Sequence, residues 1–368
     1  MKITVSKEIS ALVPYPPGKP IEELERELSI KGSIKLASNE NPFGPSKKAV
    51  AAVAATLANL HRYPDGSCFY LKEKLSRHIG VSPDMLIIGN GSNEIIELVI
   101  KACLKPGDEA VMAVPSFAVY PIAISASAGK AVTVPLKDFR HDLEAMATAI
   151  GPRTRLVFIA NPNNPTGTIV TDNELTRFLK AVPDDVIVCV DEAYYEFARN
   201  PGFPKTLEHV KRREKAVLLL RTFSKVYGLA GLRVGYGVAD AALVDYMNRV
   251  RQPFNVNSLA QAAAMAALDD REHLEKTVQN NIQGLVYLLG ELKSMGLECV
   301  PTEANFFLVR AGDGKKVYDA LLKKGVIVRP MDSYGLGEYI RVTVGLPEEN
   351  SRFIRSLQEV LGLARRPL

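Results

Sequence analysis

Three neighbouring stretches decide the fold of this chain: LVFIANPNNPTG at residues 156–167, VIVCVDEAYYEF at 186–197 and LLLRTFSKVYGLAGLRVGY at 218–236. Each stretch opens with a short run of apolar residues and then turns polar. Continuous runs of β-branched residues and leucine are typical of strands that are buried on both faces. The three stretches therefore predict strands of a parallel sheet, with polar residues where each strand ends.

The same pattern extends outward from these stretches. We expect strands at residues 85–88, 109–114, 131–134, 156–159, 186–190, 216–221 and 233–238. Helical patterns lie between several of them, at residues 93–103, 117–127, 142–150 and 172–181. Strand–helix alternation over this many units predicts an α/β fold whose large domain has a mostly parallel, doubly wound sheet flanked by helices.

The two ends of the chain follow a different pattern. A long helical region at 258–295 precedes strands near 306–309, 326–328 and 339–344 and a last helix from residue 348. The first 45 residues are rich in proline and glycine and are typical of an extended arm. We therefore expect three parts, which are an N-terminal arm that joins the small domain (1–45), a large domain (46–257) and a smaller α+β domain with a long connecting helix (258–368).

Composition excludes several classes of protein. The 368 residues carry 46 Lys and Arg against 41 Asp and Glu, and no basic run is longer than 211–213, so nucleic acid is not an expected partner. No apolar run approaches the roughly 18 residues of a membrane helix. The N-terminus lacks the apolar core of a signal peptide. We expect a cytoplasmic enzyme that binds neither nucleic acid nor a membrane.

Cysteine and histidine patterns point to no metal. The four cysteines are far apart and form no CxxC pair, which is typical of reduced thiols in a reducing compartment. The five histidines show no metal-binding spacing such as HExxH. No metal site is predicted.

The residues that follow each strand carry the chemistry. After the strand at 85–88 comes GNGSNE, where Ser92 and Asn93 begin a helix whose free N–H groups attract anions. This pattern fits a phosphate cradle and an ordinary helix cap about equally, and it lacks the GK[ST] of a Walker A loop. The other strand ends add an amide loop around Asn164, a carboxylate at Asp191 and a lysine at Lys225.

Each of these signals alone also fits a turn, a cap or a solvated charge. Together, with Thr222, Ser224 and Arg233, they match the needs of a phosphorylated pyridine aldehyde. A lysine forms a Schiff base, a carboxylate keeps the pyridine nitrogen protonated, and hydroxyls with an arginine bind phosphate. The combination predicts pyridoxal 5′-phosphate as cofactor.

The motifs NPNNPTG, DEAY and TFSKVYGLAGLRVGY closely resemble those of the class I/II aminotransferases, which have PLP fold type I. Further motifs along almost the whole chain resemble the histidinol-phosphate aminotransferases among them. These motifs are PYPPGKPIEEL, LASNENPFGPS, RYPDGS, RQPFNVNSLAQ, ANFFLV and YIRVTVGLPEEN. The resemblance implies that the large domain binds pyridoxal 5′-phosphate.

The resemblance also implies a role for each matching residue. Lys225 would form the Schiff base, Asp191 would pair with the pyridine nitrogen, and Asn164 and Tyr194 would bond the phenolic oxygen. Phe117 would stack on the ring. The phosphate ligands would be Ser92, Asn93, Thr222, Ser224 and Arg233.

On the substrate side, the resemblance implies that Arg341 grips an α-carboxylate. Arg329 and Tyr15 would bind the substrate's phosphate or the distal carboxylate of glutamate, and Asn39 would lie near the substrate. Tyr63 would reach the cofactor phosphate of a neighbouring subunit, which makes a homodimer with a shared active site.

The function that the resemblance implies is transamination between histidinol phosphate and 2-oxoglutarate in histidine biosynthesis. An aromatic amino-acid aminotransferase is the main alternative, and a threonine-phosphate decarboxylase is the next. A dinucleotide-binding dehydrogenase would need G-x-G-x-x-G at the first strand, which is missing. A transcription regulator of this fold would need a DNA-binding domain, for which the first 45 residues are too short and too rich in proline.

Overall fold

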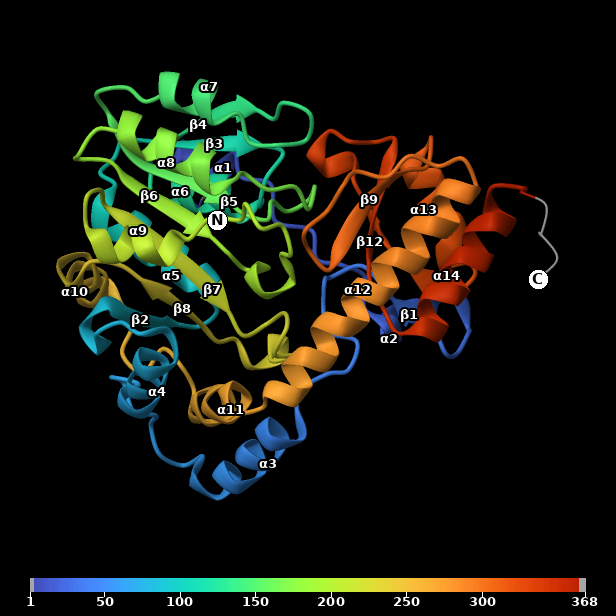
Figure 1. Cartoon of the computed structure of the whole chain (residues 1–368), viewed down its shortest axis with the longest axis horizontal. Helices are drawn as coiled ribbons and strands as arrows, with labels where there is room; N and C mark the ends of the chain where they lie inside the picture. Colours follow the sequence, from blue (N-terminus) through green and yellow to red (C-terminus); the bar gives the residue numbers. More distant parts are fainter. Residues whose placement is uncertain (1–2, 364–368) are drawn as a thin grey trace.

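The computed structural model describes residues 3–363, and its largest unit is a seven-stranded sheet with helices on both faces (Figure 1). The strands lie in the order β2-β8-β7-β6-β5-β3-β4. Their bounds are β2 Leu86–Gly89, β3 Glu109–Val114, β4 Lys130–Pro135, β5 Thr154–Ala160, β6 Ile187–Asp191, β7 Val217–Thr222 and β8 Gly235–Val238. Neighbouring strands are parallel except for β8, which runs antiparallel to β2 and β7. The predicted mostly parallel α/β sheet is confirmed.

Strand β8 is shorter than its sequence pattern predicts. The apolar pattern predicts a strand from Arg233, whereas β8 begins at Gly235. Arg233 has a φ of +57°, a left-handed conformation that a strand excludes, and it follows the short 3₁₀ helix η4 (Ala230–Leu232). The prediction was wrong at this point because an apolar pattern does not reveal a left-handed turn.

Alternate residues of the strands face two apolar layers. On one face, Leu218 and Leu220 of β7 pack with one group of helices, and on the other face Leu219 packs with a second group. The first group is α5 (Ser92–Cys103), α6 (Val119–Ala126) and α10 (Ala241–Val250). The second group is α4 (Phe69–Ile79), α7 (Leu143–Thr148), α8 (Asp172–Ala181), α9 (Thr206–Arg212) and α11 (Ser258–Leu268). Burial on both faces explains the continuous apolar runs of these strands.

The C-terminal part forms a second, smaller sheet with its own helices. Its three strands are β11 (Arg329–Pro330), β12 (Tyr339–Thr343) and β9 (Phe306–Arg310), paired antiparallel in that order. The helices beside it are α12 (Arg271–Ser294), α13 (Gly314–Leu322) and α14 (Pro347–Val360). These elements enclose a separate apolar cluster that includes Phe307, Val342 and Phe353.

The N-terminal segment joins both parts of the molecule. Its elements are α1 (Lys7–Ser10), α2 (Ile21–Leu28), β1 (Ile34–Lys35), α3 (Lys47–Thr56) and the 3₁₀ helix η1 (Leu57–Asn59). Strand β1 pairs in parallel with β10 (Val326–Ile327), beside the small sheet, whereas α3 packs against α11 below the large one (Figure 1). The chain therefore crosses from one sheet to the other near residues 36–46.

The long helix predicted at 258–295 is two helices. Helix α11 ends at Leu268 and α12 begins at Arg271, where the Asp270 carboxylate accepts a hydrogen bond from the backbone N–H of His273 (3.4 Å). An N-cap of this kind starts a new helix and explains the interruption. The division of the chain into parts at 45/46 and 257/258 stays a prediction.

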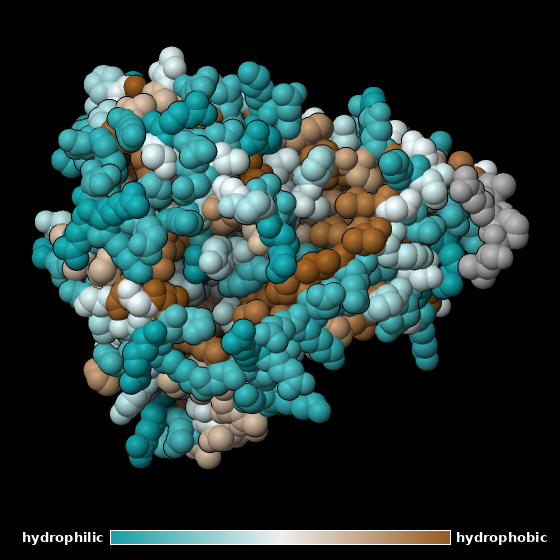
Figure 2. Space-filling model, viewed as in Figure 1, coloured by the Kyte–Doolittle hydropathy of each residue, from teal (hydrophilic) through white to brown (hydrophobic). Residues whose placement is uncertain are grey.

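The surface on the face in Figure 2 is mostly hydrophilic. Hydrophobic residues gather in a band over α12, which runs diagonally across the same view in Figure 1. Val286 of this helix is 72% exposed. Between residues 3 and 363, no helix combines the length and the apolar character needed to cross a membrane.

Candidate active site

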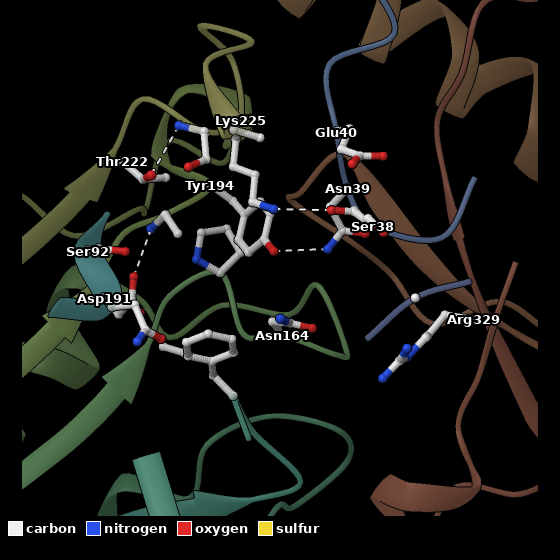
Figure 3. Close-up of a pocket in the computed structure, with 18 of the residues that line it drawn as sticks. Ser38, Asn39, Glu40, Ser92, Asn164, Asp191, Tyr194, Thr222, Lys225 and Arg329 are labelled. Atoms are coloured by element: carbon white, nitrogen blue, oxygen red, sulfur yellow. Dashed lines mark hydrogen bonds between the residues drawn. The ribbon is translucent and has the colours of Figure 1, made fainter. Parts of the chain in front are cut away.

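The carboxyl ends of β5, β6 and β7 open into a pocket that the N-terminal segment and the small sheet close from the other side (Figure 3). This is where parallel α/β sheets bind their ligands. All the site residues predicted from the sequence line this pocket except Tyr63. They are Tyr15, Asn39, Ser92, Asn93, Phe117, Asn164, Asp191, Tyr194, Thr222, Ser224, Lys225, Arg233, Arg329 and Arg341.

Lys225 follows β7 and extends its side chain across the pocket. Its Nζ donates a hydrogen bond to the backbone carbonyl of Ser38 (3.2 Å; Figure 3). Desolvation lowers the pKa of this amine to about 8, and the positive charge of Arg341 acts in the same direction. An amine with a lowered pKa has a larger neutral fraction, and the neutral amine can serve as a nucleophile or a base near neutral pH.

Asp191 ends β6 and is buried. Its Oδ2 accepts a hydrogen bond from the Tyr120 hydroxyl (2.9 Å), and its Oδ1 accepts one from the backbone N–H of Ala193 (3.1 Å). Burial raises the pKa of this carboxyl to about 6, although both hydrogen bonds oppose the rise. A buried carboxylate held by two neutral donors favours a cationic partner, and a protonated pyridine nitrogen is one.

An anion cradle lies at the start of helix α5. The backbone comes so close here that a Cβ on Gly235 of β8 would lie 2.4 Å from the backbone nitrogen of Ser92, and one on Gly91 would lie 2.6 Å from Arg233 Nη2. Ser92, Thr222, Ser224 and Arg233 bring hydroxyl, helix N–H and guanidinium donors to the same part of the pocket. This set of donors fits a phosphate group.

Three further side chains line the same pocket. The Asn164 carboxamide oxygen accepts a hydrogen bond from Arg341 Nη1, and the Tyr194 hydroxyl accepts one from Asn39 Nδ2 (2.9 Å). Phe117 packs edge-on against Tyr120, with ring centroids 5.5 Å apart. A flat ligand in the pocket would meet polar groups at its rim and an aromatic ring nearby.

Two arginines of the small sheet face the pocket from neighbouring strands. Arg341 of β12 pairs in register with Arg329 of β11. Arg341 donates to the carbonyl of Ala37 (2.8 Å), but its buried Nε has no partner among the described residues. Arg329 donates to the carbonyl of Pro16 (2.7 Å) and lies 5.6 Å from the centre of the Tyr15 ring. Buried guanidinium groups with N–H donors to spare favour carboxylate or phosphate ligands.

Sequence reasoning missed three contributions to this site. Tyr120 bonds Asp191, the Ser38 carbonyl holds Lys225, and Glu40 lines the pocket. Tyr120 follows Phe117 by three residues within the helix predicted at 117–127, and this spacing gave a usable signal, although α6 itself begins only at Val119. Ser38 acts through its backbone and had none.

Tyr63 is the one predicted site residue that lies outside the pocket. Its side chain is 82% exposed and stacks on Phe254, with ring centroids 4.7 Å apart. In a single chain it therefore has no contact with the site.

Comparison with known proteins extends the likeness beyond the pocket. The family model of aminotransferase class I and II matches residues 31–357. The chain is 52% identical to the histidinol-phosphate aminotransferase of Moorella thermoacetica over 96% of this chain and 92% of that protein. It is 50% identical to histidinol-phosphate aminotransferase 2 of Carboxydothermus hydrogenoformans over 97% of this chain and 99% of that protein.

A solved structure of the same kind of enzyme is also similar in fold to this chain. The histidinol-phosphate aminotransferase of Sinorhizobium meliloti in complex with pyridoxal-5′-phosphate has a TM-score of 0.89 to this chain at 28% identity, and the match covers 97% of each. The resemblance predicted from the motifs is confirmed. This chain belongs to the class I and II aminotransferases and, within them, to the histidinol-phosphate aminotransferases.

Proposed function

We propose that the protein transfers an amino group between histidinol phosphate and 2-oxoglutarate, with pyridoxal 5′-phosphate as its cofactor, in histidine biosynthesis. One observation carries this proposal. A desolvated lysine, a buried carboxylate and a cradle of hydroxyl, N–H and guanidinium donors lie in one pocket, opposite two buried arginines. The names of the relatives described above support the choice of substrate.

The pocket fits the cofactor group by group. The start of α5 with Thr222, Ser224 and Arg233 would hold the phosphate, and Asp191 would hold the ring nitrogen. Asn164 and Tyr194 would bond the phenolic oxygen, Phe117 would cover the ring, and Ser92 and Asn93 would donate to the phosphate. Bound there, pyridoxal phosphate supplies an aldehyde that reacts with amines and a ring that takes up negative charge.

Side chains of the protein then carry out the proton transfers. Lys225, with its pKa lowered to about 8, has an appreciable neutral fraction near pH 7 and takes the proton from the substrate carbon next to nitrogen. The Ser38 carbonyl, 3.2 Å from Nζ, holds this amine in place between transfers. Asp191, if ionised, would keep the ring nitrogen of the bound cofactor protonated, which is the state in which the ring can take up negative charge.

Both substrates bring anions to the arginine side of the pocket. Arg341 would hold the α-carboxylate of glutamate or 2-oxoglutarate with its planar, bidentate fork. Arg329 and Tyr15 would hold the distal carboxylate or, in the other half of the reaction, the phosphate of histidinol phosphate. Asn39 would lie beside the bound substrate.

We also propose that the enzyme is a homodimer in which Tyr63 reaches the partner's cofactor phosphate. Tyr63 and its stacking partner Phe254 are exposed, and so are Phe69 and Tyr70 a few residues further along the chain. Exposed apolar side chains that gather in this way favour burial against another subunit. A cytoplasmic location is part of the proposal, and the four unpaired cysteines support it.

The test is a comparison of substrates on the purified holoenzyme. We expect a visible absorption band that borohydride bleaches, and turnover of histidinol phosphate with 2-oxoglutarate well above that of phenylalanine or threonine phosphate. Faster transamination of phenylalanine would favour an aromatic aminotransferase, and release of carbon dioxide from threonine phosphate would favour a decarboxylase. A colourless protein that takes up no pyridoxal phosphate would refute all three.

A further inference from the structure

Asn39 occupies an unusual place at the edge of the active site. It is 1% exposed and adopts a left-handed backbone conformation, with φ at +55°. Its backbone carbonyl accepts a hydrogen bond from Asn305 Nδ2 (3.2 Å), and its side chain reaches Tyr194, which follows β6 of the large sheet, and Thr343 of the small sheet. Asn39 therefore connects the cofactor side of the pocket with the substrate side.

The hydrogen bonds around Asn39 fix the orientation of its carboxamide. The Thr343 hydroxyl accepts from the backbone N–H of Asn39 (3.0 Å), so its own proton is free to be donated. It donates that proton to Asn39 Oδ1 (3.0 Å). With Oδ1 committed to Thr343, the amide must present Nδ2 to the Tyr194 hydroxyl, 2.9 Å away (Figure 3).

This orientation decides what the Tyr194 hydroxyl can do. A tyrosine hydroxyl has one proton to donate, and an amide nitrogen can only donate to it. Tyr194 therefore accepts from Asn39, and this is the one hydrogen bond that its hydroxyl makes within residues 3–363. Its own proton remains available to an acceptor in the pocket.

We propose that Asn39 is a positioning residue, which makes the Tyr194 hydroxyl donate its proton to the phenolic oxygen of the cofactor. The inference rests on the cofactor and the Tyr194 role proposed above. It adds to the predicted place of Asn39 beside the substrate, because it assigns the hydrogen bonds of the side chain to Tyr194 and Thr343. Thr343 lies two residues after Arg341 on β12, so the strand that would hold the substrate carboxylate also orients this donor.

The other charged groups near Tyr194 come from several elements. Burial raises the pKa of this hydroxyl and the Asp191 carboxylate acts in the same direction, whereas Arg341 of β12 and the hydrogen bond from Asn39 oppose the rise. Lys225 Nζ lies 5.5 Å from the centre of its ring, and Tyr334 lies near Arg341. Substitutions at Thr343 leave all these groups in place, so they isolate the effect of the hydrogen bonds.

The experiment is a pH titration of the holoenzyme that follows the visible absorption band of the bound cofactor. The midpoint of the change in this band is the apparent pKa of the cofactor. A donor to the phenolic oxygen stabilises its anionic form and lowers this apparent pKa, so loss of the donor raises it. Tyr194→Phe should raise it by about one unit or more. Thr343→Val frees the carboxamide to turn, and Asn39→Asp offers Tyr194 an acceptor, so both should raise it in the same direction. Thr343→Ser keeps the hydroxyl and should retain the wild-type value.

Double variants that also carry Tyr194→Phe show whether Asn39 and Thr343 act through the Tyr194 hydroxyl or affect the cofactor in another way. In the Tyr194→Phe background, Thr343→Val should cause no further shift, and Asn39→Asp should retain only the part that its added charge causes. Equal shifts of Thr343→Val with and without the Tyr194 hydroxyl would overturn the inference. So would wild-type values for both Thr343→Val and Asn39→Asp in a holoenzyme whose pKa responds to Tyr194→Phe. A protein with no cofactor band would instead overturn the proposed function.

Discussion

Asp191 depends on a hydrogen bond from a tyrosine on a neighbouring helix. The Tyr120 hydroxyl is 2.9 Å from Oδ2 and opposes the rise in pKa that burial causes. In the role proposed for it, the carboxylate must be ionised to keep the pyridine nitrogen of the cofactor protonated, and its charge is lost as the pH falls through its pKa. Tyr120→Phe raises that pKa, so the acid limb of the kcat profile should move to higher pH by about one unit.

The control for this substitution is another buried tyrosine. Tyr236 packs on the opposite face of the sheet, where the Arg221 charge acts on it, and it makes no contact with Asp191. Tyr236→Phe should leave the acid limb where it is. An unchanged acid limb in Tyr120→Phe would mean that the hydrogen bond does not control the ionisation of Asp191.

Arg341 offers a second prediction, on substrate binding. Its buried Nε has no partner among the described residues, and its planar fork can take both oxygens of a carboxylate. Arg341→Lys retains the positive charge but loses the planar guanidinium group that can donate two hydrogen bonds to one carboxylate. KM for 2-oxoglutarate should therefore rise by about 10–100-fold, as expected for lost hydrogen bonds to a charged group. Steady-state kinetics checks this. Arg310→Lys on neighbouring β9, which pairs with exposed Glu338, should leave KM unchanged.

At the scale of elements, the contact between β8 and α5 shapes the phosphate cradle. A Cβ at Gly235 would lie 2.4 Å from the Ser92 backbone nitrogen and 3.0 Å from the Arg221 carbonyl, so strand and helix must separate to admit it. Overpacking of this kind costs about 1–3 kcal/mol. Gly235→Ala should therefore raise the Kd for pyridoxal phosphate about tenfold and lower the Tm.

The control for Gly235→Ala is the same substitution at a glycine far from the cradle. Gly290 lies in α12, where an added Cβ would have no neighbour within 4 Å, so alanine should stabilise that helix by about 0.5–1 kcal/mol. Fluorescence titration of the apoenzymes with the cofactor compares the two variants. Equal affinities would contradict the view that the close approach of β8 sets the cradle.

Elements with strong local signals could be predicted from the sequence. Helix α8 has its predicted bounds, because Thr171 and Glu174 form a capping box at its start. The break at Asp270 was missed, since an N-cap inside a long apolar pattern is also an ordinary surface residue. Only the start of β8 was wrong, because the left-handed turn at Arg233 depends on packing rather than on hydrophobic pattern.

The candidate site could also be predicted in part from the sequence. Lys225 and Asp191 could be recognised because each directly follows an apolar strand, and the topology brings such strand ends together. The hydrogen bond from Asn39 to Tyr194 spans 155 positions, and nothing local to either residue indicates it. Contacts of this kind depend on how the two sheets meet, which periodicity does not describe.

At the scale of the whole molecule, the pocket is divided between two sheets. The large sheet supplies the lysine, the carboxylate and the cradle, and the small sheet supplies both arginines. The segment at 37–39 lies between them, where its successive residues contact Arg341, Lys225 and Tyr194. A movement of one sheet relative to the other would therefore change several contacts at the site together.

The shared active site proposed above makes one more prediction, which is tested with two variants that should each be inactive. Lys225→Ala removes the proposed base from its own subunit, and Tyr63→Ala removes the exposed tyrosine that we propose for the partner's site. In a mixed dimer, one site carries both defects and the other carries none. Random exchange of equal amounts should therefore restore about a quarter of the wild-type activity.

The mixing experiment has a clear opposite outcome. Lys225→Ala mixed with wild-type protein reports how far subunits exchange, and sedimentation shows that each variant remains a dimer. If Tyr63 served only its own subunit, every chain in the mixture would carry one defect, because the two substitutions lie on different chains. The activity would then stay at the mean of the two parent variants after full exchange, and the site would not be shared through Tyr63.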